Sequence, residues 1–266
     1  MKIVVTGGHT GLGLELTRRL LEDSAEVGII VRSRSRLTDV PSGIRDRLTV
    51  WEADLASRDA VDAVAEEIRG AWSHVDVLFN NAGVLLGEFR TSPQGNEMHL
   101  EVNTLAPYRL TRRLKPALDA ADRPIVVNTV TGSMHRTPLV VEELTDAARF
   151  QKLFGAYLHS KMALTLLMNE LAADPEWSDV VIRNVNPGAN RTGMTSGEGV
   201  PWWLRPLRPF LFSAPTLGAN LLYDAAFDDA HGRSTGQYFD QKRIREVTQT
   251  LGDDDRAALM ERLGAL

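Results

Sequence analysis

The chain has 266 residues, of which 43% are hydrophobic and 24% charged, as is typical of a soluble globular protein. Its formal net charge of −5 does not favour binding to nucleic acid or to an anionic membrane. It has no cysteine, which excludes disulfide bonds and thiolate catalysis, and its six histidines form no HxxxH or HxH pair, so we expect no metal site. No signal peptide or long apolar run is evident, and we expect a cytoplasmic protein without a membrane anchor.

Short apolar runs alternate with helical patterns along the whole chain. Strands are expected over residues 2–6, 26–31, 48–53, 75–79, 124–130, 180–185 and 237–240. Helices are expected over 12–22, 57–72, 95–120 with a bend near Pro107, 155–173, 215–227, and 253–263 with Asp253 as its N-cap. This alternation predicts a single-domain α/β Rossmann fold over residues 1–266, a doubly wound parallel sheet of about seven strands with helices on both faces.

A glycine-rich turn, TGGHTGLG from Thr6 to Gly13, separates the first strand from the first helix. Gly7 permits a tight turn, Gly11 lets the backbone approach a ligand closely, and Gly13 lets the helix pack against the strand. The N-terminus of the helix points its N–H groups over the turn, where they suit a pyrophosphate. On its own, the turn is equally consistent with a plain strand-to-helix connection.

The strand ends carry small and polar residues, and ligands of such sheets bind beside the carboxyl ends of the strands. After the second strand comes VRSRSR, after the third Asp54 and Leu55, and after the fourth NNAG. After the fifth strand comes TGS at 131–133, and after the sixth NPG at 186–188. We expect these ends to converge on one site.

Tyr157 and Lys161 are four residues apart, so on a helix they lie on one face. A free phenol has a pKa of about 10, too high for acid–base work near neutrality. A neighbouring ammonium stabilises the phenolate and lowers that pKa, which would allow Tyr157 to act as a general acid and base. The alternative is an ordinary surface pair on an exposed helix.

Taken together and in order, these motifs closely resemble those of the short-chain dehydrogenase/reductase family. TGGHTGLG at 6–13, Asp54, NNAG at 80–83, Asn103, a hydroxyl after the fifth strand, YLHSK at 157–161 and PGANRT at 187–192 match its standard TGxxxGxG/YxxxK subfamily. His135, the long gap before Tyr157 and the region 214–219 resemble its retinol-dehydrogenase-like branch. The resemblance extends from residue 2 to about 240.

The resemblance implies a role for each matching residue. The pyrophosphate would lie on Gly7, Gly11 and Gly13, with His9, Thr10 and Leu12 in the same turn. The adenine would contact Asp54 and Leu55, and the adenosine ribose would lie near Asn81, Ala82 and Gly83. The nicotinamide would contact Pro187, Gly188 and Thr192, and Lys161 would bind its ribose. Asn103 would place a water in a proton relay behind Lys161.

Cofactor preference follows from Arg32, which stands where NAD-specific sites carry an acidic residue for the ribose 2′-hydroxyl. A guanidinium suits a 2′-phosphate, so we expect NADP(H), with Arg32 as the main contact. The alternative is that Arg32 only solvates a loop end. His9 and Thr10 could add a phosphate contact.

The hydroxyl that would hold the substrate oxygen is Ser133 or Thr131, of which we favour Ser133. The segment 189–214 contains Trp202, Trp203 and several prolines, and reads as an apolar lid over the substrate. The alternative for this segment is a docking surface for a second subunit or a membrane.

The sequence therefore predicts an NADP(H)-dependent oxidoreductase that interconverts a carbonyl and an alcohol on an apolar small molecule, with Tyr157 as general acid and base. One alternative is a C=C reductase on the same scaffold, as in the protochlorophyllide reductases, although the absence of cysteine counts against that activity. Another is a non-catalytic NADP-sensing protein. The resemblance allows a monomer or a homo-oligomer associated through the helices around 96–120 and 155–173.

Overall fold

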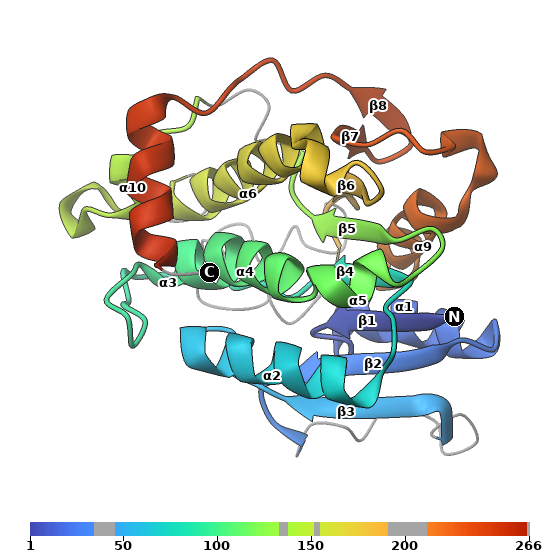
Figure 1. Cartoon of the computed structure of the whole chain (residues 1–266). Helices are drawn as coiled ribbons and strands as arrows, with labels where there is room; N and C mark the ends of the chain where they lie inside the picture. Colours follow the sequence, from blue (N-terminus) through green and yellow to red (C-terminus); the bar gives the residue numbers. More distant parts are fainter. Residues whose placement is uncertain (35–45, 133–137, 152–154, 191–211, 265–266) are drawn as a thin grey trace.

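A largely parallel sheet organises the chain in this computed structural model, which describes all residues except 35–45, 133–137, 152–154, 191–211 and 265–266 (Figure 1). The strand order is β3-β2-β1-β4-β5-β6-β7-β8, and only the last pairing is antiparallel within this described part. The strands are β1 (Lys2–Thr6), β2 (Glu26–Val31), β3 (Leu48–Glu52), β4 (Val77–Asn80), β5 (Ile125–Thr129), β6 (Val181–Asn186), β7 (Gln237–Asp240) and β8 (Arg243–Arg245).

Helices cover both faces of the sheet. On one face α1 (Gly11–Glu22) packs against α9 (Pro215–Phe227), and on the other lie α2 (Arg58–Ala71), α4 (Ala106–Arg113) and α6 (Ala156–Ala173) (Figure 1). The other α-helices among the described residues are α3 (Met98–Leu100), α5 (Lys115–Asp119) and α10 (Asp253–Leu263). A π-helix, η3 (Glu101–Leu105), follows α3, and short 3-10 helices are η5 (Val141–Leu144), η6 (Ala147–Arg149), η7 (Pro175–Trp177) and η9 (Asp229–His231).

The predicted Rossmann fold is confirmed, and the seven predicted strands are present within two residues at each end. The sequence missed β8, a short RIR strand whose residues are all exposed and which therefore carries no alternating apolar pattern. A tight turn at Gln241, with a positive φ of 58°, folds it back onto β7. None of the described helices has the length and apolarity needed to cross a membrane.

The helical region predicted over 95–120 runs without a break from Met98 to Arg113 as α3, η3 and α4. The π-helix Glu101–Leu105 comes just before Pro107, the second residue of α4, so the irregularity expected near Pro107 takes the form of a π-turn. The break comes later, at Leu114, and Pro116 occupies the first turn of α5, where a proline is tolerated because its missing N–H is not needed.

The predicted N-cap of the last helix is also wrong. Gly252 is the N-cap of α10, and Asp253 is its first residue, where its carboxylate pairs with Arg256 at 3.2 Å. Three consecutive aspartates in this first turn place negative charge against the positive end of the helix dipole. The acidic residues thus stabilise the helix start through charge rather than through a capping hydrogen bond.

Buried asparagines connect the central strands side chain to side chain. Asn80 on β4 donates to Asn128 on β5 at 2.9 Å, and Asn128 donates to Asn184 on β6 at 3.1 Å. These residues face each other in the strand register. Thr111 of α4 and Asn169 of α6 complete the row at its two ends. We call this row the amide ladder, and it ties three strands to the helices that cover them.

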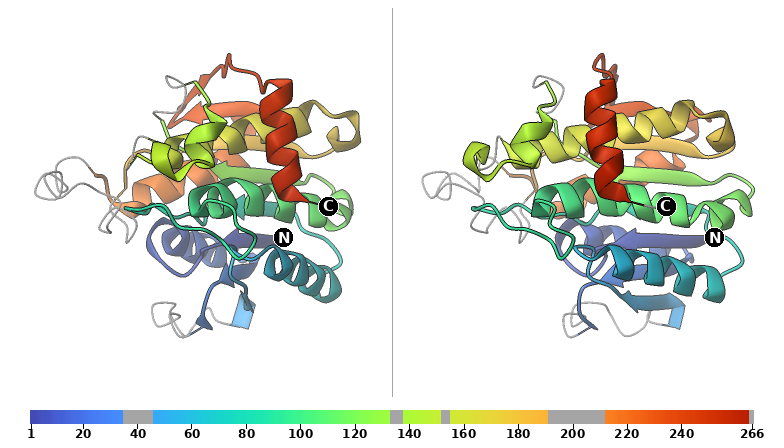
Figure 2. Two further views of the ribbon diagram at one scale, coloured as in Figure 1. Left: turned by 90° about the vertical axis from the view of Figure 1, so that its left-hand side faces the viewer. Right: turned by 60° about the vertical axis from the view of Figure 1, so that its left-hand side comes forward.

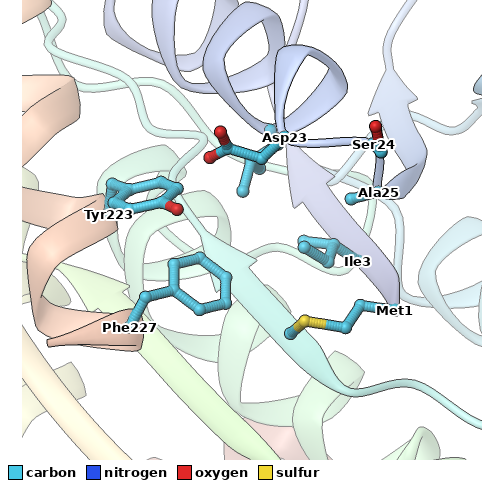
Figure 3. A pocket seen from close by; sticks show the side chains of 8 residues that line it. Met1, Ile3, Asp23, Ser24, Ala25, Tyr223 and Phe227 are labelled. Atoms are coloured by element: carbon cyan, nitrogen blue, oxygen red, sulfur yellow. The ribbon is translucent and has the colours of Figure 1, made fainter. Parts of the chain in front are cut away.

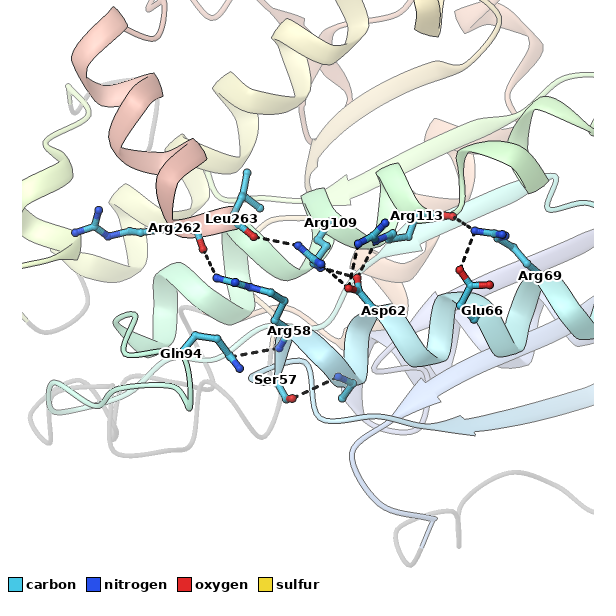
Figure 4. A network of polar contacts seen from close by, with 11 residues as sticks. Ser57, Arg58, Asp62, Glu66, Arg69, Gln94, Arg109, Arg113, Arg262 and Leu263 are labelled. Carbon is cyan, nitrogen blue, oxygen red and sulfur yellow. Dashed lines mark hydrogen bonds and ion pairs between the residues drawn. The ribbon is translucent and has the colours of Figure 1, made fainter. Parts of the chain in front are cut away.

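The C-terminal helix α10 is held by arginine side chains from the helices beneath it (Figure 4). Arg58 donates to the Arg262 carbonyl at 2.7 Å and Arg109 to the Leu263 carbonyl at 3.0 Å. Asp62 on α2 in turn forms ion pairs with Arg109 and Arg113. Cations at the C-terminus of a helix also complement its dipole. In consequence α10 lies against the α4 and α6 side of the molecule (Figure 2).

The Asp62 cluster makes a testable contribution to stability. Burial acts to raise the pKa of Asp62, but hydrogen bonds from Arg109 and Arg113 outweigh it and hold the pKa below the ordinary 3.8. The charged carboxylate therefore stabilises the folded state above that pH, and its contribution is lost as the pH falls through the lower folded-state pKa. Asp62→Asn should reduce the free energy of unfolding by about 1–3 kcal/mol at neutral pH.

Urea denaturation measures this effect, with Asp119→Asn as the matched control. Asp119 pairs with Lys115 on an exposed helix surface, so its loss should change stability by about 0.5 kcal/mol or less. The difference between wild type and Asp62→Asn should shrink at acid pH. Equal effects of the two substitutions would contradict a structural role for the Asp62 cluster.

Candidate functional site

A large cavity opens at the carboxyl edge of the sheet, where the segments that follow β1 to β6 meet. Its volume is about 1010 Å³, at the upper end of the range for small-molecule sites. Most of the predicted site residues line it, namely Gly7, His9, Thr10, Gly11, Leu12, Gly13, Arg32, Asp54, Leu55, Asn81, Ala82, Gly83, Tyr157, Lys161, Pro187 and Gly188. The convergence of strand ends expected from the sequence is present.

Asn103 does not line the cavity and is fully buried behind its wall. Ser133 and Thr192 lie outside the described residues. Other residues also line the cavity. Ser33 and Asn186 belong to strand ends that the sequence singled out, and Phe212 belongs to the predicted lid segment. Met98, Val102 and Gln241 were not predicted, because tertiary contacts rather than a local sequence pattern bring them to the cavity.

The glycine turn has the geometry of an anion cradle. Gly7 and Gly11 have positive φ angles of 67° and 54°, which side-chain-bearing residues rarely adopt. A Cβ on Gly13 would lie 2.4 Å from the Gly7 carbonyl oxygen, so this position requires glycine. The N-cap of α1, Thr10, makes no side-chain capping bond, and no acidic residue occupies the first turn. The helix N-terminus is therefore free to receive a pyrophosphate, and the chain fits a dinucleotide here.

The NNAG segment is bound directly to this turn. The Thr6 hydroxyl accepts hydrogen bonds from the backbone N–H groups of Asn81 and Ala82, both at 2.9 Å. The Asn81 side chain donates back to the Thr6 carbonyl at 3.0 Å. These bonds connect the ends of the neighbouring strands β1 and β4 at the point where the strand order reverses, which is the usual ligand position in such sheets.

Arg32 and Asp54 mark the rim of the cavity. Arg32 is exposed there, and no carboxylate among the described residues pairs with it. Arg34 is engaged elsewhere, because its guanidinium donates to the Val50 carbonyl at 2.7 Å and its backbone N–H to Glu52. The Asp54 carboxylate accepts from the Ala56 N–H at 3.0 Å, which shapes the turn after β3. Of the first two arginines after β2, only Arg32 lines the cavity.

Tyr157 and Lys161 reach the cavity from the first turns of α6. The Lys161 ammonium is buried and donates to the Thr129 carbonyl at the end of β5, at 2.8 Å. Burial lowers the pKa of Lys161 to about 8 and raises the pKa of Tyr157 to about 12. Burial thus moves the phenol pKa opposite to the lowering expected from Lys161. The phenol is a protonated acid at neutral pH, while the lysine remains largely cationic.

Asn103 lies in the π-helix and bonds to two separate segments. Its side-chain oxygen accepts from the Val84 N–H at 2.8 Å, and its amide donates to the Val84 carbonyl and to the Ser160 hydroxyl. Ser160 in turn donates to the Tyr157 carbonyl at 2.7 Å. Asn103 therefore joins the cavity wall at Val84 to the helix that carries Tyr157. Its predicted part in a water relay stays a prediction.

The substrate end of the cavity is only partly described. Thr131, the alternative catalytic hydroxyl, lines the cavity, whereas Ser133 lies outside the described residues. The same applies to Trp202 and Trp203, so the lid prediction stays open. The two ends of the predicted lid do meet, since the Ser213 N–H donates to the Ala189 carbonyl at 2.8 Å, and Phe212 lines the cavity beside them.

A second, smaller cavity lies at the opposite edge of the sheet, near the start of β1 (Figure 3). It has a volume of about 210 Å³ and is bordered by the Tyr223 and Phe227 rings, whose centroids are 4.6 Å apart. The Arg19 guanidinium lies 3.5 Å from the centroid of the Tyr223 ring. This cavity is too small for a dinucleotide and is far in the fold from Tyr157, so the large cavity is the candidate active site.

Comparisons with known proteins agree with this geometry. Residues 1–199 match the family model of the short chain dehydrogenases. Retinol dehydrogenase 12 of Homo sapiens is 30% identical over 243 residues, covering 89% of this chain and 76% of that protein. Among solved structures, the Pseudomonas aeruginosa RhlG/NADP active-site complex is 22% identical with a TM-score of 0.70, covering 90% of this chain and 93% of that one. The 3-ketoacyl-(acyl-carrier-protein) reductase from Brucella melitensis, complexed with NADH, is 21% identical with a TM-score of 0.70, covering 90% and 95%.

The glycine cradle can be tested by adding a single methyl group. Gly13→Ala should weaken NADPH binding roughly tenfold or more, because the new Cβ would push the Gly7 carbonyl and the Asn81 amide out of place. Gly70→Ala is the control, since a Cβ there meets nothing within 4 Å and the residue lies in the last turn of α2. NADPH fluorescence titration and thermal melting of both variants provide the measurement. Unchanged binding in a folded Gly13→Ala protein would contradict the cradle.

Proposed function

This chain belongs to the short-chain dehydrogenase/reductase family, in its retinol-dehydrogenase-like branch, and from this premise we propose an NADP(H)-dependent enzyme that interconverts carbonyl and alcohol groups on apolar small molecules. Membership makes it an oxidoreductase acting on a CH–OH or C=O group. The cofactor preference, the substrate class and the residue roles are the proposed parts. They are supported above all by one observation, that Tyr157 and Lys161 line the same cavity as the glycine cradle.

In the proposed reaction Tyr157 transfers a proton to or from the substrate oxygen. A bound nicotinamide would supply or accept the hydride at the substrate carbon. During reduction the Tyr157 phenol gives its proton to the carbonyl oxygen, and during oxidation the phenolate takes the proton of the alcohol. The pKa of Tyr157, raised by burial to about 12, keeps the phenol protonated and ready for the reducing direction.

Lys161 stabilises the charge that Tyr157 acquires when it loses its proton. One of its N–H groups is fixed on the Thr129 carbonyl, which holds the ammonium in place. An ammonium has three donors, so two remain for the nicotinamide ribose hydroxyls. Ser133 stays our choice over Thr131 for the hydroxyl that holds the substrate oxygen, and Asn103 our choice for the relay.

Arg32 supports the choice of NADP(H) over NAD(H). It stands at the cavity rim after β2, it is exposed, and no acidic side chain of the described residues neutralises it. A 2′-phosphate would supply the missing negative partner, whereas a 2′-hydroxyl would not. Family likeness alone does not decide between NADP(H) and NAD(H), because proteins of this fold have been solved with NADP and with NADH.

The apolar substrate class is supported by apolar side chains in the cavity lining. Leu85, Leu86, Met98, Val102 and Phe212 are among them. The name of the human relative, retinol dehydrogenase 12, makes all-trans-retinal a reasonable first test compound, and decanal a simpler one. A cytoplasmic location, the lack of a membrane anchor and the choice between monomer and homo-oligomer stay predictions.

Tyr157→Phe tests the mechanism. The variant keeps the ring but lacks the acidic proton, so NADPH oxidation with all-trans-retinal or decanal should fall at least a hundredfold. NADPH binding should persist, because the cradle and Lys161 are untouched. Tyr223→Phe, at the opposite edge of the sheet, is the control and should retain activity. The mechanism is wrong if Tyr157→Phe turns over these aldehydes at the wild-type rate.

Arg32→Asp tests the cofactor assignment. Replacing a cation by an acidic residue should repel the 2′-phosphate and favour the 2′-hydroxyl, so the ratio of kcat/KM for NADPH over NADH should fall by roughly a hundredfold. Arg34→Gln is the control, since Arg34 binds the backbone of β3 and lies outside the cavity lining. An unchanged NADPH/NADH ratio in Arg32→Asp would refute the assignment.

A further inference from the structure

We infer that Glu97 and His99 form a positioning pair that holds the substrate-side wall of the cavity, residues 84–86, beside the Tyr157 ring. This inference rests on the proposed function, because it assigns the wall to the substrate. Neither side chain lines the cavity, and both are almost completely buried, at 0% exposure for Glu97 and 1% for His99. They therefore act through their neighbours and are not catalytic residues.

The hydrogen bonds around His99 select one tautomer of the ring. The Leu86 backbone N–H donates to His99 Nε2 at 2.9 Å, so Nε2 must be the unprotonated nitrogen. The proton is then on Nδ1, which lies 2.8 Å from Glu97 Oε1 and donates to it. A neutral imidazole satisfies both contacts at once. A protonated ring would place an N–H against the N–H of Leu86.

Glu97 is well suited to fix that tautomer. Its other carboxylate oxygen accepts the backbone N–H groups of His99 at 2.7 Å and of Leu100 at 3.0 Å, so the carboxylate also caps α3. With the Nδ1–H of His99, three N–H groups donate to one buried carboxylate. A carboxylate held in this way has little freedom to rotate, and it orients the imidazole toward Leu86.

His99 and Asn103 together hold the wall at alternate residues. Asn103 binds both backbone groups of Val84, and His99 binds the N–H of Leu86. His99 and Asn103 are four residues apart on the helical run formed by α3 and the π-helix, and the residues they bind, Leu86 and Val84, are two apart. Val84, Leu85 and Leu86 all line the large cavity. The position of the wall thus depends on two side chains of one helical run, α3 followed by η3.

The same imidazole packs against the proposed acid. The His99 and Tyr157 rings meet edge to face, with centroids 6.4 Å apart and an interplanar angle of 73°. Phe150 covers another side of the imidazole at 6.0 Å. His99 therefore connects the apolar wall that would receive the substrate to the phenol that would protonate it.

Two substitutions separate the hydrogen bond of His99 to Leu86 from its hydrogen bond to Glu97. His99→Gln offers an acceptor near the position of Nε2 and can keep the Leu86 contact, but it loses the donor to Glu97. His99→Asn offers a donor near Nδ1 and can keep the Glu97 contact, but it leaves the Leu86 N–H without its acceptor. Both lose the ring that packs on Tyr157, so that loss cancels when the two variants are compared.

We expect the variants to differ in KM and in the exchange of one amide. Both should show a similar, modest fall in kcat for decanal or all-trans-retinal with NADPH. His99→Asn should raise the KM for the aldehyde roughly tenfold over His99→Gln, because the wall is released. Hydrogen–deuterium exchange of the Leu86 amide should be fast in His99→Asn and close to wild type in His99→Gln. The melting temperature is recorded for each variant.

The inference requires that His99→Asn and His99→Gln differ both in the KM for the aldehyde and in the exchange of the Leu86 amide. Equal KM values in the two variants overturn it even if their melting temperatures fall, since that pattern describes a merely structural residue. Unchanged Leu86 exchange in His99→Asn overturns it as well. Failure of the proposed function looks different, because wild type would then turn over neither aldehyde, or Tyr157→Phe would remain active. In that case the exchange of Leu86 alone decides whether His99 holds the wall.

Discussion

The amide ladder is the constraint on which the rest of the site depends. Parallel strands in a doubly wound sheet are apolar on both faces, so hydrophobic burial alone tolerates shifts of one strand along another. Buried amides at Asn80, Asn128 and Asn184 do not tolerate such shifts, because any change of register would leave them unpaired at high cost. Each ladder residue lies within two positions of the end of its strand, so the ladder aligns the carboxyl ends of β4, β5 and β6 side by side. Those ends carry the NNAG segment, Thr129 to Gly132, and the segment around Gly188.

Burial shifts the pKa values of the two proposed catalytic residues, Tyr157 and Lys161. Moving Tyr157 and Lys161 out of water favours the neutral form of each, which raises the pKa of one and lowers the pKa of the other. With values of about 12 and about 8, the neutral phenol and the cationic lysine still coexist at pH 7. That combination suits proton donation to a carbonyl. The reverse direction needs the phenolate, and therefore depends more strongly on the positive charge near it.

The strand-end residues that the sequence singled out line the large cavity, whereas the contacts that hold the wall at residues 84–86 were not predicted. The glycine turn, Asp54, NNAG and the PG motif are local patterns at strand ends, and the topology of the sheet brings strand ends together without further information. Tyr157 and Lys161 were found for the same reason, since their spacing alone places them on one helix face. The wall at residues 84–86, by contrast, depends on the π-helix at Glu101–Leu105 and on Glu97, and neither has a periodic signature. Short exposed β8 was missed because nothing in its three residues alternates.

The C-terminal helix constrains how copies of this chain can associate. Association through the helices around 96–120 and 155–173 requires their outer surfaces to be accessible. Leu259 and Leu263 of α10 are buried in the same hydrophobic core as α4 and α6, and Arg109 holds the end of α10 by donating to the Leu263 carbonyl. Arg256 adds an ion pair to Glu170 on α6. A partner subunit approaching that side meets α10 first, so an interface there must include α10 or displace it together with its buried leucines.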